Sequence, residues 1–171
     1  MPAGGFFVLY LLGSVAVTVG GLHAQLPDGV NVETRQVEER DPLWGESRIT
    51  IVEGTDARGV SYRLVRATPR ARPRWPRRRA ELLRRWRAAH ACSADVVAAI
   101  PPLRLGARTP PQITFAGSCE GGDRYVARLL LIGGLGYELH VDQRLRADAA
   151  GVSPAELERA FAGFVGAAHL D

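Results

Sequence analysis

Apolar and polar positions alternate in three short runs between residues 112 and 142. A period of two is typical of strands, and glycine-rich turns at residues 120–123 and 133–136 separate the runs. The pattern predicts a three-stranded antiparallel meander with one buried face and one solvated face. The buried face should hold Ile113, Phe115, Tyr125, Ala127, Leu129, Leu131, Tyr137, Leu139 and Val141, and the solvated face Arg128, Glu138, His140 and Asp142.

The last hairpin of this meander has a predicted register. A three-residue loop at residues 134–136 would put a glycine at the position that needs a positive φ. This loop pairs Leu131 with Leu139, Leu129 with Val141 and Arg128 with Asp142. Apolar side chains then meet on one face and opposite charges meet on the other, so we expect this register.

Two helices are predicted, one before and one after the meander. Ser153 and Glu156 form a capping box around Pro154. The apolar stripe that follows at helical spacing consists of Leu157, Ala160, Phe161, Phe164, Val165 and Ala168. The earlier helix begins near Pro76, after a linker rich in proline and arginine at residues 68–79. Its apolar stripe consists of Leu82, Leu83, Trp86 and Ala89.

A further hairpin precedes the linker, because Ile49 and Ile51, and then Tyr62 and Leu64, alternate with polar residues. The order of strands and helices favours an α+β fold. We expect an antiparallel sheet of about five strands with two packed helices, an α/β sandwich. This single domain is assigned to residues 47–171.

Residues 6–19 are almost entirely apolar, a length typical of a signal-peptide core and short for a membrane span. A Leu-His-Ala sequence ending at Ala24 offers a cleavage site, so the sequence predicts a signal peptide at residues 1–24 and a mature chain from Gln25. An uncleaved anchor and a buried helix are the alternatives. Residues 25–46 predict a polar lead-in segment. A signal peptide would place the protein outside the cytoplasm, secreted or periplasmic.

All 22 basic residues are arginine, and the net charge is +4. GC-rich coding explains an excess of arginine over lysine, but the arginines also gather around the linker and the first helix. A surface that binds polyanions weakly would consist of Arg74, Arg77, Arg78, Arg79, Arg84 and Arg85. Its partner would be an anionic polymer or a membrane surface. Apart from Trp75 and from Trp86, which belongs to the apolar stripe, no aromatic side chain is interleaved for base stacking, so sequence-specific nucleic-acid binding is not predicted.

Cys92 and Cys119 are the only cysteines, and in an exported protein they are expected to form a disulfide. The alternative is catalytic: residues 117–121 resemble the G-x-C-x-G nucleophile elbow of dienelactone-hydrolase-like α/β hydrolases. That resemblance implies a small cysteine hydrolase with Cys119 as nucleophile, and Asp142 and His169 follow in the matching chain order.

Other chemistry is weakly supported. A zinc site built from His90, Cys92, Cys119 and His140 lacks the usual ligand spacing. Glu138 and Asp142 share a strand face but lie roughly 13 Å apart, too far for a cooperating acid–base pair. The sequence therefore predicts no metal and no cofactor.

The element order over residues 48–170, with a strand containing a tyrosine followed by a last helix carrying Phe161 and Phe164, resembles the PsbP-like α/β sandwich of secreted bacterial proteins. That resemblance implies a non-catalytic accessory or binding domain and carries over no functional residues. The sequence favours an exported envelope protein that binds an unknown ligand.

Overall fold

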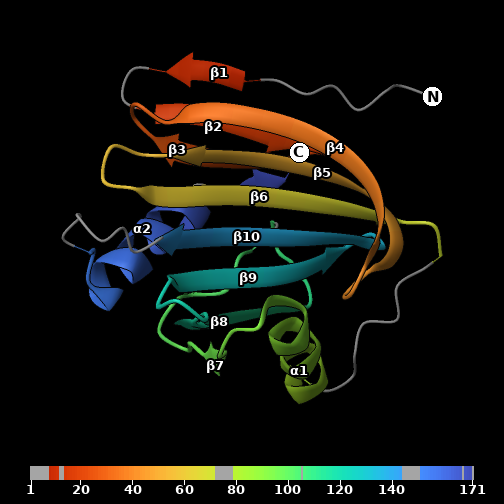
Figure 1. Cartoon of the computed structure of the whole chain (residues 1–171). Coiled ribbons are helices and arrows are strands. Elements are labelled where there is room, and N and C mark those ends of the chain that lie inside the picture. The colour runs from red at the N-terminus through yellow and green to blue at the C-terminus, as the bar shows by residue number, and fades with distance from the viewer. Residues whose placement is uncertain are drawn as a thin grey trace.

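The computed structural model describes residues 8–11, 14–71, 79–104, 106–143, 151–166 and 168–170. The fold is α+β and mostly strand, with two helices and two antiparallel sheets (Figure 1). The large sheet has seven strands in the order β4-β5-β6-β10-β9-β8-β7, and the small sheet has the order β1-β2-β3-β11. The large sheet thus exceeds the predicted five strands, because residues on both sides of the predicted set also pair.

The strands of the large sheet are β4 (Asn31–Asp41), β5 (Gly45–Thr55), β6 (Val60–Pro69), β7 (Asp95–Val96), β8 (Gln112–Ser118), β9 (Arg124–Ile132) and β10 (Leu135–Gln143). Those of the small sheet are β1 (Val8–Leu11), β2 (Ser14–Val19), β3 (Leu22–Pro27) and β11 (His169–Leu170). The helices are α1 (Arg79–His90) and α2 (Pro154–Gly166). The predicted meander, hairpin and helices are all present.

The predicted register of the β9–β10 hairpin is wrong. Leu139 lies opposite Arg128, and Leu129 lies opposite Glu138. The turn has two residues, Gly133 and Gly134, with φ of 58° and 84°. Two successive positive φ angles form the tight turn that matches the twist of a hairpin. The observed pairing is shifted from the predicted one by an odd number of residues. Each side chain of β10 therefore shares a face with the β9 side chains that were predicted to lie on the opposite face.

Other elements cover part of each face of the large sheet, and we name each face after the helix that packs on it. On the α1 face, Leu82, Leu83 and Trp86 of α1 pack on apolar residues of β5, β6, β8 and β9. On the α2 face, α2 and the β2–β3 hairpin pack on β5, β6, β9 and β10. Glu138 and His140, expected in solvent, are 8% and 7% exposed on the α1 face.

Arg128, also expected in solvent, is 1% exposed on the α2 face. Its guanidinium donates to Thr114 Oγ1 and to the Pro101 carbonyl, both at 2.7 Å. Burial lowers the pKa of Arg128 to about 10. Its partners are neutral hydrogen-bond acceptors, so this arginine ties the loop before β8 to the middle of the sheet.

The capping box at the start of α2 is confirmed. The Ser153 amide donates to Glu156 Oε2 at 2.8 Å, and the Glu156 amide donates to Ser153 Oγ at 3.3 Å. Four residues of the apolar stripe are buried in the core of the α2 face: Leu157, Phe161, Phe164 and Val165. The helix therefore begins and docks as its sequence predicts.

The apolar run near the N-terminus forms strands where the structure describes it. Its residues 14–19 are β2, which pairs with β3 through a turn at Gly20 and Gly21. Alternate side chains of this hairpin enter the core of the α2 face, namely Val15, Val17, Val19, Leu22, Ala24 and Leu26. Within the described residues no helix is long and apolar enough to cross a membrane. Cleavage after Ala24 stays a prediction, and it would remove β2 and half of β3.

Residues 25–46, predicted as a lead-in segment, are ordered: they contain β4 and the turn into β5, and Val30 and Trp44 are buried in the core. The Asp41 carboxylate accepts hydrogen bonds from the amides of Leu43 and Trp44, at 2.7 and 2.8 Å, and so shapes this turn. Trp44 then lies on the α1 face over Gly136, where an added Cβ would come within 2.4 Å of the indole. Gly136 is thus required by the tryptophan packed against it.

Candidate functional site

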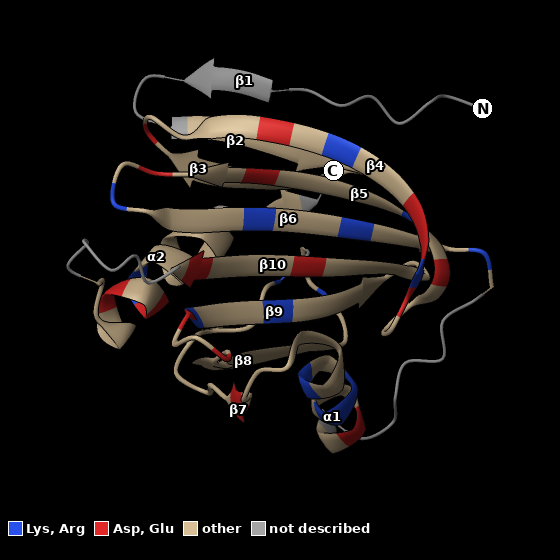
Figure 2. Cartoon of the chain, in the orientation of Figure 1, with Lys and Arg blue, Asp and Glu red and all other residues tan. Residues whose placement is uncertain are grey.

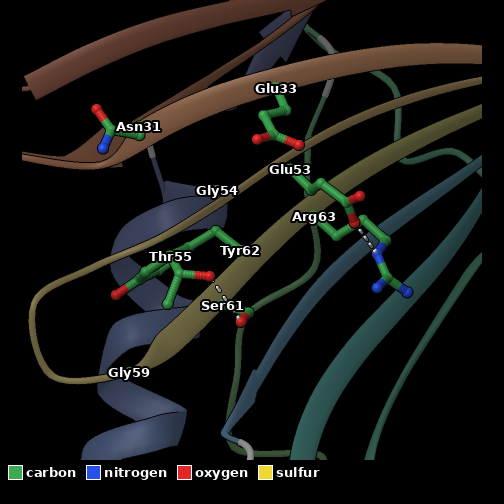
Figure 3. Close-up of a pocket in the computed structure, with 9 residues that line it drawn as sticks. All are labelled: Asn31, Glu33, Glu53, Gly54, Thr55, Gly59, Ser61, Tyr62 and Arg63. Carbon is green, nitrogen blue, oxygen red and sulfur yellow. Dashed lines mark hydrogen bonds and ion pairs between the residues drawn. The ribbon is translucent and has the colours of Figure 1, made fainter.

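A polar groove lies on the α1 face over β4, β5 and β6 (Figure 3). Neither α1 nor α2 covers this part of the sheet in Figure 1. Its volume is about 420 Å³. The polar lining residues belong to two cross-strand rows: Glu33, Glu53 and Arg63 form one, and Asn31, Thr55 and Ser61 form the other. Gly54, Gly59 and Tyr62 complete the lining. The floor of the groove is regular antiparallel sheet, so it fixes these side chains in known relative positions.

The charges along the groove are unevenly paired. Glu53 accepts hydrogen bonds from Arg35 at 3.3 Å and from Arg63 at 3.1 Å. Glu33 lies directly opposite Glu53 on the neighbouring strand. Among the described residues, no side chain forms an ion pair or hydrogen bond with the Glu33 carboxylate. The groove therefore presents one carboxylate that the described part of the chain does not neutralise.

A buried carboxylate–imidazole–carboxylate cluster adjoins the groove on β10. His140 lies opposite Arg63, and Asp142 lies opposite Ser61. His140 Nδ1 is 2.9 Å from Glu138 Oε1, and its Nε2 is 3.5 Å from Asp142 Oδ2. Their spacing along the strand puts the Glu138 and Asp142 carboxylates too far apart to interact directly. In the structure both contact the His140 imidazole, which lies between them.

Side chains from α1, β9 and β4 lie around this cluster. Trp86 of α1 stacks against His90 with ring centroids 4.2 Å apart and against Tyr125 at 4.6 Å. Tyr125 is 5.5 Å from the His140 ring. Partial desolvation lowers the pKa of His90, which stays exposed at the end of α1, and raises that of the half-buried Asp41. These aromatic rings separate the cluster from solvent, so its charges interact more strongly than they would in water.

Glu138 keeps its charge in this setting. Burial alone would raise its pKa, but the hydrogen bond with His140 and the charges of His140, His90 and Arg63 outweigh that effect, so the pKa lies below its ordinary value. A group with a lowered folded-state pKa stabilises the fold above its unfolded pKa, and this contribution disappears as pH falls through the folded pKa. Glu138 should therefore contribute to stability at neutral pH and lose that contribution in acid.

Replacing Glu138 by glutamine tests this charge. We expect Glu138→Gln to lower the free energy of unfolding at neutral pH by roughly 1.5–3 kcal/mol, because a charged hydrogen bond is lost. The variant should also lose less stability than the parent between about pH 5 and pH 3. Urea unfolding curves at a series of pH values measure both effects. Glu120→Gln, at an exposed turn position, is the control. If the free energy of unfolding of the parent and of Glu138→Gln changed with pH in parallel, Glu138 would not have the lowered pKa assigned to it.

The predicted disulfide is confirmed. Cys92 and Cys119 are bonded, with Cα atoms 4.0 Å apart and 27 positions apart in the sequence. The bond joins the chain after α1 to the turn between β8 and β9, beside Ser93, whose carbonyl accepts a hydrogen bond from the Tyr125 hydroxyl. The disulfide thus holds the end of α1 against the sheet.

Reducing this bond should weaken the protein without unfolding it. In the chain-entropy model a loop of this length contributes roughly 3 kcal/mol. Cys92→Ala/Cys119→Ala is therefore expected to unfold at lower urea concentration than the oxidised parent. Thiol titration under denaturing, non-reducing conditions should find no free thiol in the parent. A titratable thiol there, or equal stability of the two proteins, would contradict the bond.

The elbow resemblance does not fit this geometry. The Cys119 sulfur is bonded to Cys92, so it carries no thiol. Residues 119–123 form a turn from strand β8 into strand β9, whereas a nucleophile elbow leads from a strand into a helix. His169 stacks on His23 with ring centroids 4.6 Å apart, in the small sheet. The same disulfide removes both cysteine thiolates from the zinc site considered on sequence grounds. The described residues contain no cluster of three or more His, Cys, Asp or Glu side chains that could hold a metal ion.

The arginine surface is only partly described. Arg74, Arg77 and Arg78 lie outside the described residues, and Arg79 is the first residue of α1. Arg84 and Arg85 both bind the Glu81 carboxylate, at 2.6 and 3.0 Å. These bonds lower the pKa of Glu81. The two arginines are exposed but share a local anion, and polyanion binding stays a prediction.

No protein-family model, curated protein or solved structure matches this chain. The resemblance to the PsbP-like sandwich therefore remains a sequence-based expectation. Sequence reasoning missed the groove and the buried cluster. The only signal for the cluster was the spacing of Glu138, His140 and Asp142 at alternate positions, which is also typical of a solvated strand face.

Proposed function

We propose that this protein is an exported, non-catalytic binding domain and that its ligand occupies the groove over β4, β5 and β6. The observation that carries the proposal is a hollow of about 420 Å³ whose lining is mainly polar and whose floor is rigid sheet. Ligand sites are typically concave and largely preformed, with a few convergent polar groups. Here hydroxyl, amide, carboxylate and guanidinium groups line one groove (Figure 3).

The disulfide supports the exported location. Disulfides persist in oxidising compartments and are rare in the cytosol. The bond between Cys92 and Cys119 joins the chain after α1 to the turn between β8 and β9.

The surroundings of His140 support binding over catalysis. Both ring nitrogens face carboxylate oxygens, Glu138 at 2.9 Å and Asp142 at 3.5 Å. A general acid or base needs a nitrogen within hydrogen-bond reach of the substrate. The His140 side chain is 9% exposed, so it offers little surface to a molecule in the groove. The cluster is better suited to supporting Arg63 and the groove floor.

Blocking the groove tests the proposal. Ser61→Tyr places a ring in the groove, and Thr34→Tyr places the same ring on an exposed part of β4 outside it. A panel of polar metabolites and peptides is screened by thermal shift, and hits are measured by calorimetry. We expect hits on the parent and Thr34→Tyr to lose binding in Ser61→Tyr, with unchanged circular dichroism. Hits that bind all three proteins alike would place the site elsewhere.

A further inference from the structure

Resting on the proposed function, we propose that the groove binds a positively charged nitrogen group, an ammonium or a guanidinium, and that Glu33 is its main anionic contact. The inference begins with the pairing of Glu33 and Glu53. These residues lie directly opposite each other on β4 and β5, and both line the groove. Like charges that are directly opposite across two strands repel and destabilise the pair.

Within the described residues, arginines compensate one of these two charges, that of Glu53. Arg35 and Arg63 flank Glu53 at 3.3 and 3.1 Å. The described residues provide no such partner for Glu33, in a chain with 22 basic residues and a net charge of +4. Elsewhere on β4, Glu38 is bound by both Arg48 and Arg70. Figure 2 shows the acidic segments of β4 and β5 side by side, with a basic segment of β6 next to them.

The remaining lining groups suit a donor-rich cation. Asn31, Thr55 and Ser61 offer amide and hydroxyl oxygens around the same space. Thr55 and Ser61 hydroxyls are 3.1 Å apart, so one proton lies between them and acceptor lone pairs remain. An ammonium has three donors and a guanidinium five, and neither can accept. Such a group satisfies the Glu33 carboxylate and these neighbouring oxygens together.

An organic cation fits this lining better than a bare metal ion does. The groove offers two carboxylates, and Glu53 is already held by two arginines. Calcium takes six or more oxygen ligands at short distances. A ligand that carries its charge on nitrogen needs fewer protein oxygens, because its own hydrogen atoms direct the contacts. A charged nitrogen could belong to a free polyamine or to a lysine or arginine side chain of a peptide.

Isosteric removal of the Glu33 charge tests the inference. Spermidine is the free amine, and a terminally blocked Gly-Arg-Gly peptide presents a side-chain guanidinium. Each is titrated by calorimetry into the parent, Glu33→Gln and Glu39→Gln. Glu39 is the matched control, because it is an exposed glutamate of the same strand outside the groove. We expect Glu33→Gln to weaken binding about tenfold or more, and Glu39→Gln to leave it within about twofold. Whichever probe shows this pattern identifies the source of the nitrogen.

The variant has a second expected property. Because Glu33→Gln removes a like-charge pair, it should be at least as stable as the parent in urea unfolding. The cationic assignment would be overturned if the parent and Glu33→Gln bound both probes with equal affinity. It would also be overturned if the parent bound neither spermidine nor the Gly-Arg-Gly peptide. If neutral or anionic ligands are then lost in Ser61→Tyr, the groove is still the binding site and only the ligand class is wrong. If Ser61→Tyr weakens the binding of no ligand of any charge, the proposed function is wrong as well.

Discussion

Deleting residues 1–24 is expected to prevent stable folding. The deletion removes the buried side chains of Val15, Val17, Val19, Leu22 and Ala24 from the core of the α2 face. Burying each valine or leucine contributes roughly 1.5–3 kcal/mol, so the four larger side chains together contribute about 6–12 kcal/mol. A typical domain has a net stability of about 5–15 kcal/mol, which this loss would largely remove.

The loss would also expose the surface that the hairpin covers. Val52 and Leu64 of the large sheet belong to the same core cluster as β2 and β3. The Tyr137 hydroxyl donates to the Gly20 carbonyl at 3.1 Å, and that buried tyrosine would lose its partner. We therefore expect the truncated chain to aggregate or to lack a cooperative urea transition, as followed by circular dichroism.

A shorter deletion provides the control. Removing residues 1–13 keeps β2 and β3 and should leave the urea midpoint near that of the full chain. The experiment also bears on the predicted signal peptide, whose cleavage leaves Gln25 first. A native protein that mass spectrometry shows to begin at Gln25, together with a stable 25–171 chain, would show that the hairpin is dispensable for the fold.

The N-terminal hairpin shows why an apolar run is ambiguous in sequence. Val15, Val17 and Val19 alternate with Ala16 and Thr18, which are small and weakly polar, so the period of two is faint. A signal-peptide core and a half-buried strand both fit such a run. In the structure residues 14–19 pair with β3 and pack on the large sheet, and both are tertiary effects that local spacing does not contain.

The β9–β10 hairpin shows a different limit. Its strands and its glycine turn were predicted, but the run Gly-Gly-Leu-Gly allows loops of two or three residues. Gly133 and Gly134 form the turn, whereas Gly136 is a glycine because Trp44 lies against it. Trp44 is distant in sequence, so the reason for that glycine was invisible. The resulting odd shift placed Glu138 and His140 on a covered face.

The groove could not be predicted because its residues share no local motif. Glu33 lies in the segment expected to be a lead-in, and Glu53 and Arg63 lie on either side of a turn. Only the pairing of β4 with β5 and of β5 with β6 brings the three into one row. The disulfide, by contrast, was predictable, because a chain with only two cysteines has a single intramolecular pairing.

Replacing Phe161 by alanine is expected to lower the free energy of unfolding by roughly 3–5 kcal/mol, the typical cost of truncating a buried phenylalanine. Phe161 is 0% exposed, in the middle of the apolar stripe of α2. Its neighbours in the core are held by the sheet and cannot collapse far into the space that alanine leaves. The loss should therefore combine the transfer free energy of the ring with a cavity term.

Phe161→Ala also removes a contact with Arg128, so the loss of stability should lie in the upper part of that range. The Arg128 guanidinium carbon is 5.8 Å from the centre of the Phe161 ring, within the range of a cation–π contact. Burial already lowers the pKa of Arg128 to about 10, so the guanidinium depends on its few contacts. Urea unfolding of Phe161→Ala and Phe161→Leu measures the effect, and leucine should retain most of the stability because it fills part of the cavity. Equal stability of Phe161→Ala and the parent would show that α2 does not pack on the sheet through this residue.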